Sequence, residues 1–294
     1  MKGFVVVGVK GVRWGRGRVV SGVVASVAAG VAVGAFSLAG PASAQPEAAG
    51  GDGGRWVKPT IVLEHGAFAD ASSWNGVIKE LRADGYPVVA AANPLRGPAY
   101  DAAALRSVLD HIKGPKILVG HSYGGNVISQ AATNNPDVKA LVYVAAFLPA
   151  PGESALELTN KFPGSTLPDT LDPAPTTLPD GTKGTDLYIQ QDKFPHQFAA
   201  DVPRNQAALA ATTQRPIAQN ALEEKATTAA WKTIPTWDII TTHDLNIPPA
   251  TQRFMAHRAH AHTTEIPASH SVAVSHPHTV THTIEQAAHT TTHH

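Results

Sequence analysis

The sequence predicts an α/β fold, a doubly wound and mostly parallel sheet of about six strands with an inserted helical cap. Short β-rich runs alternate with helical patterns from Thr60 to Phe147, which is typical of a parallel sheet covered by helices on both faces. A stretch rich in Pro, Thr and Asp interrupts this alternation, and strand character resumes at Pro235. The chain has 294 residues and is 43% apolar, which is enough for one domain with a sizeable core.

The first part of the core alternates four predicted strands with three predicted helices, close to the density of a doubly wound sheet. Trp74, Val77 and Leu81 recur at helical spacing and Gly85 is a good helix stop, so the first helix spans 72–85. The other elements are the strands TIVLEHG (60–66), YPVVAAANP (86–94), KILVG (116–120) and VKALVYVAAF (138–147), and helices over 100–112 and about 124–133.

After Leu148 the pattern breaks. Residues 149–234 are predicted to form the cap, with a turn-rich half followed by two helical stretches, NQAALAATT and IAQNALEEKATTAAW. Such lids commonly shape substrate entry and exclude water. The core resumes with the strand PTWDIITT (235–242), the helix PATQRFMAHRAH, the short strand HTTEIP and the helix HTVTHTIEQAA. We therefore assign residues 59–148 and 235–294 to the core.

The N-terminal segment has the layout of an export signal. Five basic residues precede the first acidic one, Glu47: Lys2, Lys10, Arg13, Arg16 and Arg18. An apolar stretch follows from Val19 to Gly40, and Ala42 and Ala44 then form the small-x-small pattern of a signal-peptidase site. We expect residues 1–44 to be a signal peptide cut after Ala44, residues 45–58 to be a flexible leader, and the protein to be secreted.

The alternative for this segment is an uncleaved membrane anchor, because Val19 to Leu38 is long enough to span a bilayer. Its richness in Gly, Ala and Ser, and the position of the cleavage pattern, favour a cleaved signal. We therefore expect no stable membrane span after cleavage.

Net charge and cysteine content limit the partners and the chemistry that we expect of the chain. Removal of the signal leaves 18 basic and 23 acidic residues, a net charge of −5, so nucleic acid is not an expected partner. The chain has no cysteine, so neither disulfides nor thiol chemistry are available to it. The sequence indicates no cofactor and leaves the oligomeric state open.

The motif Gly120-His121-Ser122-Tyr123-Gly124 lies between the strand KILV and the apolar helix pattern NVISQAA. This is the G-x-S-x-G nucleophile elbow in its required strand-turn-helix context. The glycines are needed because the sharp turn crowds the residues two before and two after the serine. Ser122 is therefore the predicted nucleophile.

A serine hydroxyl needs a base, which is itself oriented by a third group, and in this topology the acid precedes the histidine along the chain. Asp244 comes just after the strand 235–242, and His270 comes a few residues after the last strand. Asp238 is the rival acid, but it falls inside an apolar strand. We predict a triad of Ser122, Asp244 and His270.

An acyl-transfer site also needs two hydrogen-bond donors for the oxyanion. The backbone N–H groups of Tyr123 and Ala67 are the predicted donors, one from the elbow and one from the loop after the first strand. Phe68 and Tyr123 are expected to line the substrate pocket, whereas His65 and His121 are expected to make structural hydrogen bonds.

A histidine-rich tail raises the possibility of a metal site. His257, His260 and His262 have a spacing that can cluster imidazoles, but no carboxylate pattern or cysteine accompanies them. We expect no metal.

The segments VLEHGAFADASSW, GHSYGG, THDLNIPP and ASHS together resemble the α/β-hydrolase superfamily, especially the branch of salicylate methyl esterase-like proteins and hydroxynitrile lyases. The resemblance covers nearly all of residues 60–288. It implies the same triad and the same oxyanion donors, under a helical cap. Lyase members carry a lysine just after the catalytic histidine and a threonine in the loop, where this chain has Ser271 and Gly66. These departures favour hydrolysis.

The sequence thus predicts a secreted serine hydrolase that cleaves small to medium carboxylic esters through an acyl-enzyme. Two alternatives stay open, a hydroxynitrile lyase-like C–C lyase and a non-catalytic protein that binds a small ligand on the same fold.

Overall fold

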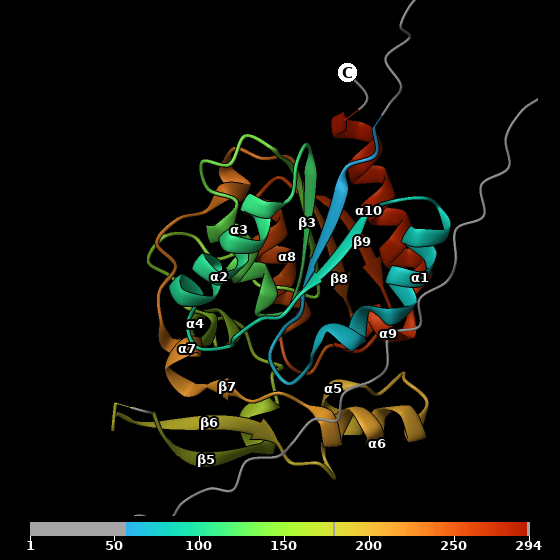
Figure 1. Ribbon diagram of the computed structural model, residues 1–294. Helices are drawn as coiled ribbons and strands as arrows, with labels where there is room; N and C mark the ends of the chain where they lie inside the picture. The colour runs from blue at the N-terminus through green and yellow to red at the C-terminus, as the bar shows by residue number, and fades with distance from the viewer. Residues whose placement is uncertain (1–56, 179, 293–294) are drawn as a thin grey trace, which may run out of the picture. The chain divides into compact units, whose positions relative to one another are not determined.

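The computed structural model describes residues 57–178 and 180–292. The predicted signal peptide and all but the last two residues of the leader lie outside these described residues. A six-stranded parallel sheet has the strand order β2-β1-β3-β4-β8-β9 (Figure 1). The predicted fold class and the predicted number of sheet strands are confirmed.

The elements of the core follow the predicted order. The sheet is formed by β1 (Thr60–Glu64), β2 (Val88–Ala91), β3 (Lys116–His121), β4 (Val138–Val144), β8 (Thr236–Thr241) and β9 (His262–Ile266). The core helices are η1 (Ala71–Trp74), α1 (Asn75–Ala83), α2 (Pro98–His111), α3 (Gly124–Ala131), α8 (Pro249–Arg258), α9 (Val272–Ser275) and α10 (Pro277–Thr292).

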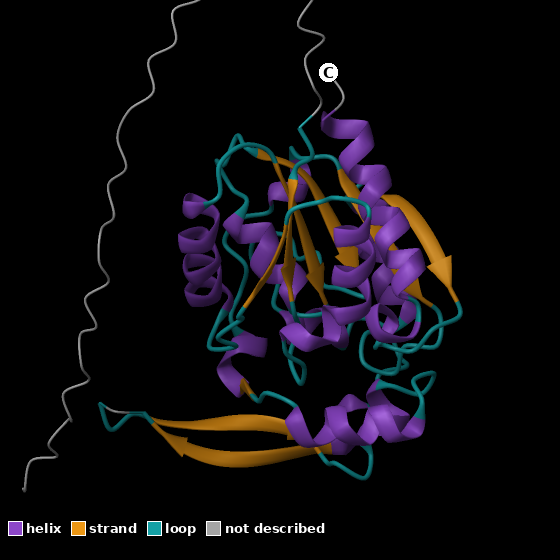
Figure 2. Ribbon diagram, turned by 45° about the vertical axis from the view of Figure 1, so that its right-hand side comes forward, coloured by secondary structure: helices purple, strands orange, loops and turns teal. Residues whose placement is uncertain are grey.

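Two apolar cores sandwich the sheet because successive side chains of a strand point to opposite faces. Ile61 and Leu63 of β1 pack with α1 and α10, whereas Val62 between them packs with α2 and α3. Helices accordingly cover both faces of the sheet (Figure 2). The six strands of this sheet are parallel, so their carboxyl ends lie at one edge. The residues that follow β1, β3, β8 and β9 can meet at this edge.

The cap contains a small sheet that the sequence analysis does not predict. Its helical parts are α4 (Ala155–Thr159), η2 (Leu167–Thr170), α5 (Phe194–Phe198), α6 (Arg204–Thr213), α7 (Gln219–Glu223) and η3 (Ala230–Lys232). Between and beside them, β5 (Leu171–Thr177), β6 (Lys183–Ile189) and β7 (Ile217–Ala218) form an antiparallel sheet in that order (Figure 1).

The prolines explain why β5 looks like a loop in the sequence. Pro173 and Pro175 cannot donate to a ladder, and such residues are tolerated only on edge strands, which is the place of β5. The stretch 217–231, expected to be helical throughout, instead begins with β7, is an α-helix over Gln219–Glu223 and ends in the short helix η3. Within the described residues, no helix is both long and apolar enough to cross a membrane.

Candidate active site

Ser122 lies at the turn between β3 and α3, at the carboxyl edge of the sheet. Its φ of 53° is in the left-handed region, where a non-glycine residue is strained. A Cβ on Gly120 would come within 2.7 Å of the Gly124 carbonyl oxygen, and one on Gly124 within 2.5 Å of the Glu64 carbonyl oxygen. The two glycines therefore allow the tight turn that lifts the Ser122 hydroxyl off the sheet.

His270 connects the other two predicted residues. Its Nε2 lies 2.8 Å from Ser122 Oγ, and its Nδ1 lies 2.7 Å from Asp244 Oδ2. The His270 and Asp244 side chains are both almost fully buried. The structure thus brings together three residues from loops after β3, β8 and β9. A hydroxyl held by an imidazole that is itself held by a carboxylate can act as a nucleophile.

The Asp244 carboxylate is fixed by four further hydrogen bonds. Oδ1 accepts from the backbone N–H groups of Asn246 at 2.8 Å and Ile247 at 3.0 Å. Oδ2 accepts from Thr241 Oγ1 at 2.9 Å and Gln252 Nε2 at 3.0 Å. Burial alone raises the pKa of Asp244, but the charge and hydrogen bond of His270 and the backbone N–H groups of Ile247 and Asn246 outweigh it and lower the pKa. The carboxylate therefore stays ionised beside the imidazole.

The rival acid is elsewhere. Asp238 lies within β8 and is 1% exposed, and neither of its carboxyl oxygens has a hydrogen-bond partner. Burial raises the pKa of Asp238 well above its ordinary value. This carboxyl has no contact with His270, so the structure places Asp244, and not Asp238, beside the imidazole.

The two predicted oxyanion donors lie beside the serine. A Cβ on Gly66 would come within 2.6 Å of the Ser122 Cβ, which shows how closely the loop after β1 passes the nucleophile. Ala67 and Tyr123 are buried, and within the described part of the chain neither backbone N–H has an acceptor from the protein. Two unused buried amides are unusual unless a ligand takes them.

Tyr123 has a second contact that the sequence analysis missed. Its hydroxyl donates a 2.7 Å hydrogen bond to Oδ2 of Asp101, a buried residue in the first turn of α2. Burial and the Asp101 charge raise the pKa of Tyr123 far above its ordinary value. The phenol is therefore a fixed, neutral donor that anchors the residue after the nucleophile.

Hydrogen bonds to the cap, which we call the latch, hold the loop that carries His270. Asp201, which follows α5, accepts hydrogen bonds from Ser269 N and Oγ and from Ser275 Oγ. Ser271 Oγ donates to the Phe198 carbonyl oxygen at 2.9 Å. The serines on either side of the histidine thus tie the imidazole loop to the cap.

His65 and His121 make hydrogen bonds behind the site, as expected. His65 accepts from the Asn93 backbone N–H at 3.1 Å, so its Nδ1 carries the proton that faces the Gly66 carbonyl oxygen. His121 Nε2 donates to the His270 carbonyl oxygen at 2.8 Å. Burial, helped by the nearby His270 charge, lowers the pKa of His121 to about 3.

This depressed pKa predicts a loss of stability in acid. An unfolded His121 binds a proton below about pH 6.5 but the folded one does not, so stability present above that pH falls as the pH drops towards 3. At pH 5 the loss relative to pH 7.5 is about 2 kcal/mol from this residue. His121→Gln keeps an N–H donor that does not titrate. Between pH 7.5 and pH 5 the free energy of unfolding in urea should therefore fall by about 2 kcal/mol less in this variant than in the wild type.

The exposed His257→Gln variant is the matched control, and it should follow the wild type. An equal fall in the wild type and in His121→Gln would contradict the prediction.

The cavity above Ser122 is small and apolar. It has a volume of about 60 Å³ and includes Phe68 and Tyr123, the two predicted pocket residues. The rest of its lining is mainly apolar and comes from the cap and from the ends of the sheet: Ala67, Phe147, Leu156, Thr159, Leu167, Pro168, Leu171, Phe198, Leu222, Asn246, Ile247, Ser122 and His270. Phe198 packs edge-on against both Phe68 and His270.

The predicted histidine cluster of the tail can be followed as far as residue 292. Over residues 57–178 and 180–292, no group of three or more His, Asp or Glu side chains is placed to hold a metal ion. His257 and His260 are exposed, and His262 stacks on Trp237.

The chain is similar to known hydrolases in sequence and in fold. The sequence model described as "Alpha/beta hydrolase family" matches residues 61–283. Pyrethroid hydrolase from Sphingobium wenxiniae is 34% identical over 104 residues, which are 31% of this chain and 37% of the relative. Carbendazim hydrolyzing esterase from a Nocardioides species is 33% identical over 114 residues, 34% of this chain and 47% of the relative.

Each of these two matches thus spans less than half of the relative's length. Among solved structures, polyneuridine aldehyde esterase superposes with a TM-score of 0.69 and 19% identity, over 78% of this chain and 99% of the other. At this identity the likeness is one of fold.

Proposed function

This chain belongs to the alpha/beta hydrolase family, and we propose that it is a serine hydrolase that cleaves small to medium carboxylic esters. The observation that carries the proposal is the hydrogen-bonded chain from Ser122 through His270 to Asp244, with two unused amides beside it. The two relatives described above, a hydrolase and an esterase by name, support the same class of reaction.

The reaction proceeds in two halves. His270 Nε2 takes the Ser122 proton as Oγ attacks the ester carbonyl carbon, and the Ala67 and Tyr123 amides hold the oxyanion. The imidazolium then gives this proton to the leaving alcohol, which departs and leaves an acyl-Ser122. Water, deprotonated by His270, attacks the acyl carbon; the imidazolium then returns the proton to Ser122 Oγ as the bond between the acyl carbon and Oγ breaks, which releases the carboxylic acid. Asp244 keeps the Nδ1 proton in place and stabilises the imidazolium throughout.

Pre-steady-state hydrolysis of p-nitrophenyl butyrate tests this proposal. An acyl-enzyme predicts a burst of p-nitrophenol close to one equivalent whenever deacylation is slower than acylation, followed by steady turnover. A folded protein that binds esters without releasing any p-nitrophenol would contradict it and favour the non-catalytic alternative.

The lyase alternative has less support from the residues around the serine. The lining of the catalytic cavity contains neither lysine nor arginine, and Ser271, where the lyases carry a lysine, uses its hydroxyl on the Phe198 carbonyl. Departing cyanide would have no lysine or arginine beside it. We therefore expect no cyanide release from mandelonitrile at the enzyme concentrations that hydrolyse esters.

We also propose that the protein is exported and cleaved after Ala44, on the basis of its charged, apolar and small-residue segments in order. Secreted protein should begin at Gln45 when its N-terminus is sequenced. Retention of residues 19–38 in a membrane fraction would contradict cleavage and support the anchor.

A further inference from the structure

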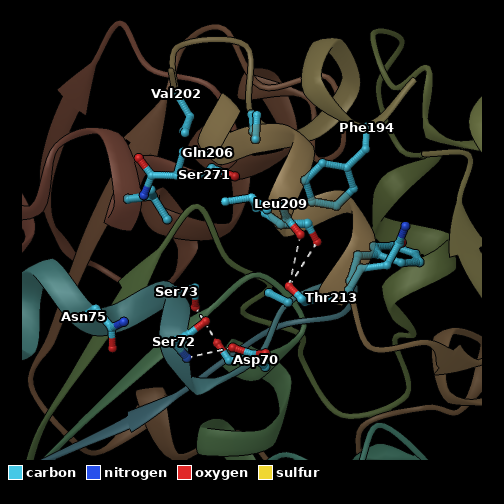
Figure 3. A pocket seen from close by; sticks show the side chains of 17 residues that line it. Asp70, Ser72, Ser73, Asn75, Phe194, Val202, Gln206, Leu209, Thr213 and Ser271 are labelled. Carbon is cyan, nitrogen blue, oxygen red and sulfur yellow. Dashed lines mark hydrogen bonds between the residues drawn. The ribbon is translucent and has the colours of Figure 1, made fainter. Parts of the chain in front are cut away.

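A second pocket lies between the cap and the loop that follows β1 (Figure 3). It shares Phe68 with the catalytic cavity. Its volume is about 220 Å³, and three segments of the chain line it. Asp70 and Ser72 come from the loop and η1, Leu209 comes from α6, and Ser271 and Val274 follow the catalytic histidine. The lining combines apolar side chains with uncharged polar ones and Asp70, and contains no lysine or arginine.

The two cavities are neighbours because they share a lining side chain. Phe68 lines both of them, and its ring lies 6.2 Å from that of Phe198, edge to face. Phe198 and His270 face the catalytic cavity, while the next residue after each, Ala199 and Ser271, faces the second pocket. The Phe68 backbone is fixed, since its N–H donates to the Arg215 carbonyl oxygen at 3.0 Å. The rings of Phe68 and Phe198 therefore form part of the partition between the two cavities.

The volumes indicate why a second pocket is needed. Sites for small organic ligands usually measure about 300–1,000 Å³. The catalytic cavity, at about 60 Å³, holds an ester carbonyl and a short apolar group. A medium-sized ester needs a larger volume. The neighbouring pocket of about 220 Å³ is lined in part by Ser271 and Val274, which belong to the segment that follows His270.

We propose that the second pocket is the subsite for the alcohol part of the ester, with Phe68 and Phe198 forming the neck between the two cavities. This inference rests on the proposed esterase function. The leaving oxygen must face His270, which protonates it, and the chain just after His270 leads into the second pocket. Cap side chains such as Leu156 and Leu222 line only the catalytic cavity, so they face the acyl part.

The chemistry of the lining specifies the alcohol. Phe194, Val202 and Leu209 provide apolar contacts, and Asp70 is the one ionisable side chain in the lining. An anionic alcohol would meet the Asp70 carboxylate with no cation to offset it. The subsite therefore fits uncharged aryl or branched alkyl alcohols, combined with short acyl groups in the catalytic cavity.

Ala210→Phe tests the assignment, because Ala210 is an exposed residue of α6 that lines the second pocket. A phenylalanine there should fill the pocket, and KM for benzyl acetate should rise by about tenfold. KM for methyl acetate, whose alcohol does not reach the pocket, should change by less than about twofold. Ala208→Phe is the matched control, because Ala208 is exposed on the same helix but does not line the pocket.

A second measurement does not depend on turnover. Benzyl alcohol should bind the wild-type protein in a calorimetric titration, with a dissociation constant raised in Ala210→Phe by about the same factor as KM for benzyl acetate. Thermal unfolding of both phenylalanine variants establishes that each is folded.

Two results would overturn the assignment while leaving the esterase intact. One is an unchanged KM for benzyl acetate in folded Ala210→Phe. The other is a raised KM for methyl hexanoate instead, which would place the acyl chain in the second pocket. A wild-type protein that hydrolyses none of these esters would overturn the proposed function itself, and the subsite assignment with it.

Discussion

Ser122→Ala should lower kcat/KM for p-nitrophenyl butyrate by at least about 10⁴-fold, because it removes the only group that can form the acyl-enzyme. The substitution deletes one oxygen from a site where Ser122 Oγ contacts His270 Nε2 at 2.8 Å, so the fold should survive. Residual activity should come only from the oxyanion donors and binding.

Ser107→Ala is the matched control, since Ser107 is an exposed residue of α2 that lines neither cavity. It should keep wild-type activity. A folded Ser122→Ala with activity near that of this control would exclude Ser122 as the nucleophile.

Asp244→Asn should lower kcat by about 10⁴-fold with little change in KM. An asparagine amide facing His270 Nδ1 donates a hydrogen bond, so it favours the tautomer with the proton on Nε2. That tautomer cannot take the proton of Ser122. The backbone N–H groups of Asn246 and Ile247 still have a side-chain oxygen to bind, so the loop should keep its shape.

The rival acid provides the control for this substitution. Asp238→Asn replaces a buried carboxyl whose neutral form the interior already favours, so activity should be retained. The account would be contradicted if Asp238→Asn lost activity and Asp244→Asn did not. Initial rates over a range of substrate concentrations separate kcat from KM for both variants.

The core and the elbow were predictable because local pattern and tertiary structure agree there. Side chains along β1 point alternately to the two faces, so Ile61 and Val62 lie in different cores, and the uninterrupted apolar run of this strand indicates burial on both faces. The spacing of glycines around Ser122 reflects backbone contacts under 3 Å that no other residue tolerates. Asp244 could be preferred over Asp238 because a residue that follows a strand lies at the carboxyl edge of the sheet, whereas a residue inside the strand points into one face of the sheet.

The parts that could not be predicted depend on contacts between distant segments. Among the described residues β5 pairs with β6 alone, and this pairing along one edge tolerates the two prolines of an otherwise turn-like run. The latch from Asp201 to Ser269 and the support of Asp244 by Gln252 join residues that no local pattern pairs. The second pocket likewise exists only once α6 lies against the loop after β1, so composition carries no sign of it.

A fluorophosphonate probe tests the convergence of the three side chains most directly. An activated serine oxygen attacks the phosphorus and expels fluoride, which leaves a covalent phosphonate that mass spectrometry locates. We predict one adduct per chain, on the peptide containing Ser122, formed much more slowly in Asp244→Asn. A folded protein that stays unlabelled, or that is labelled equally well after Ser122→Ala, would contradict the account.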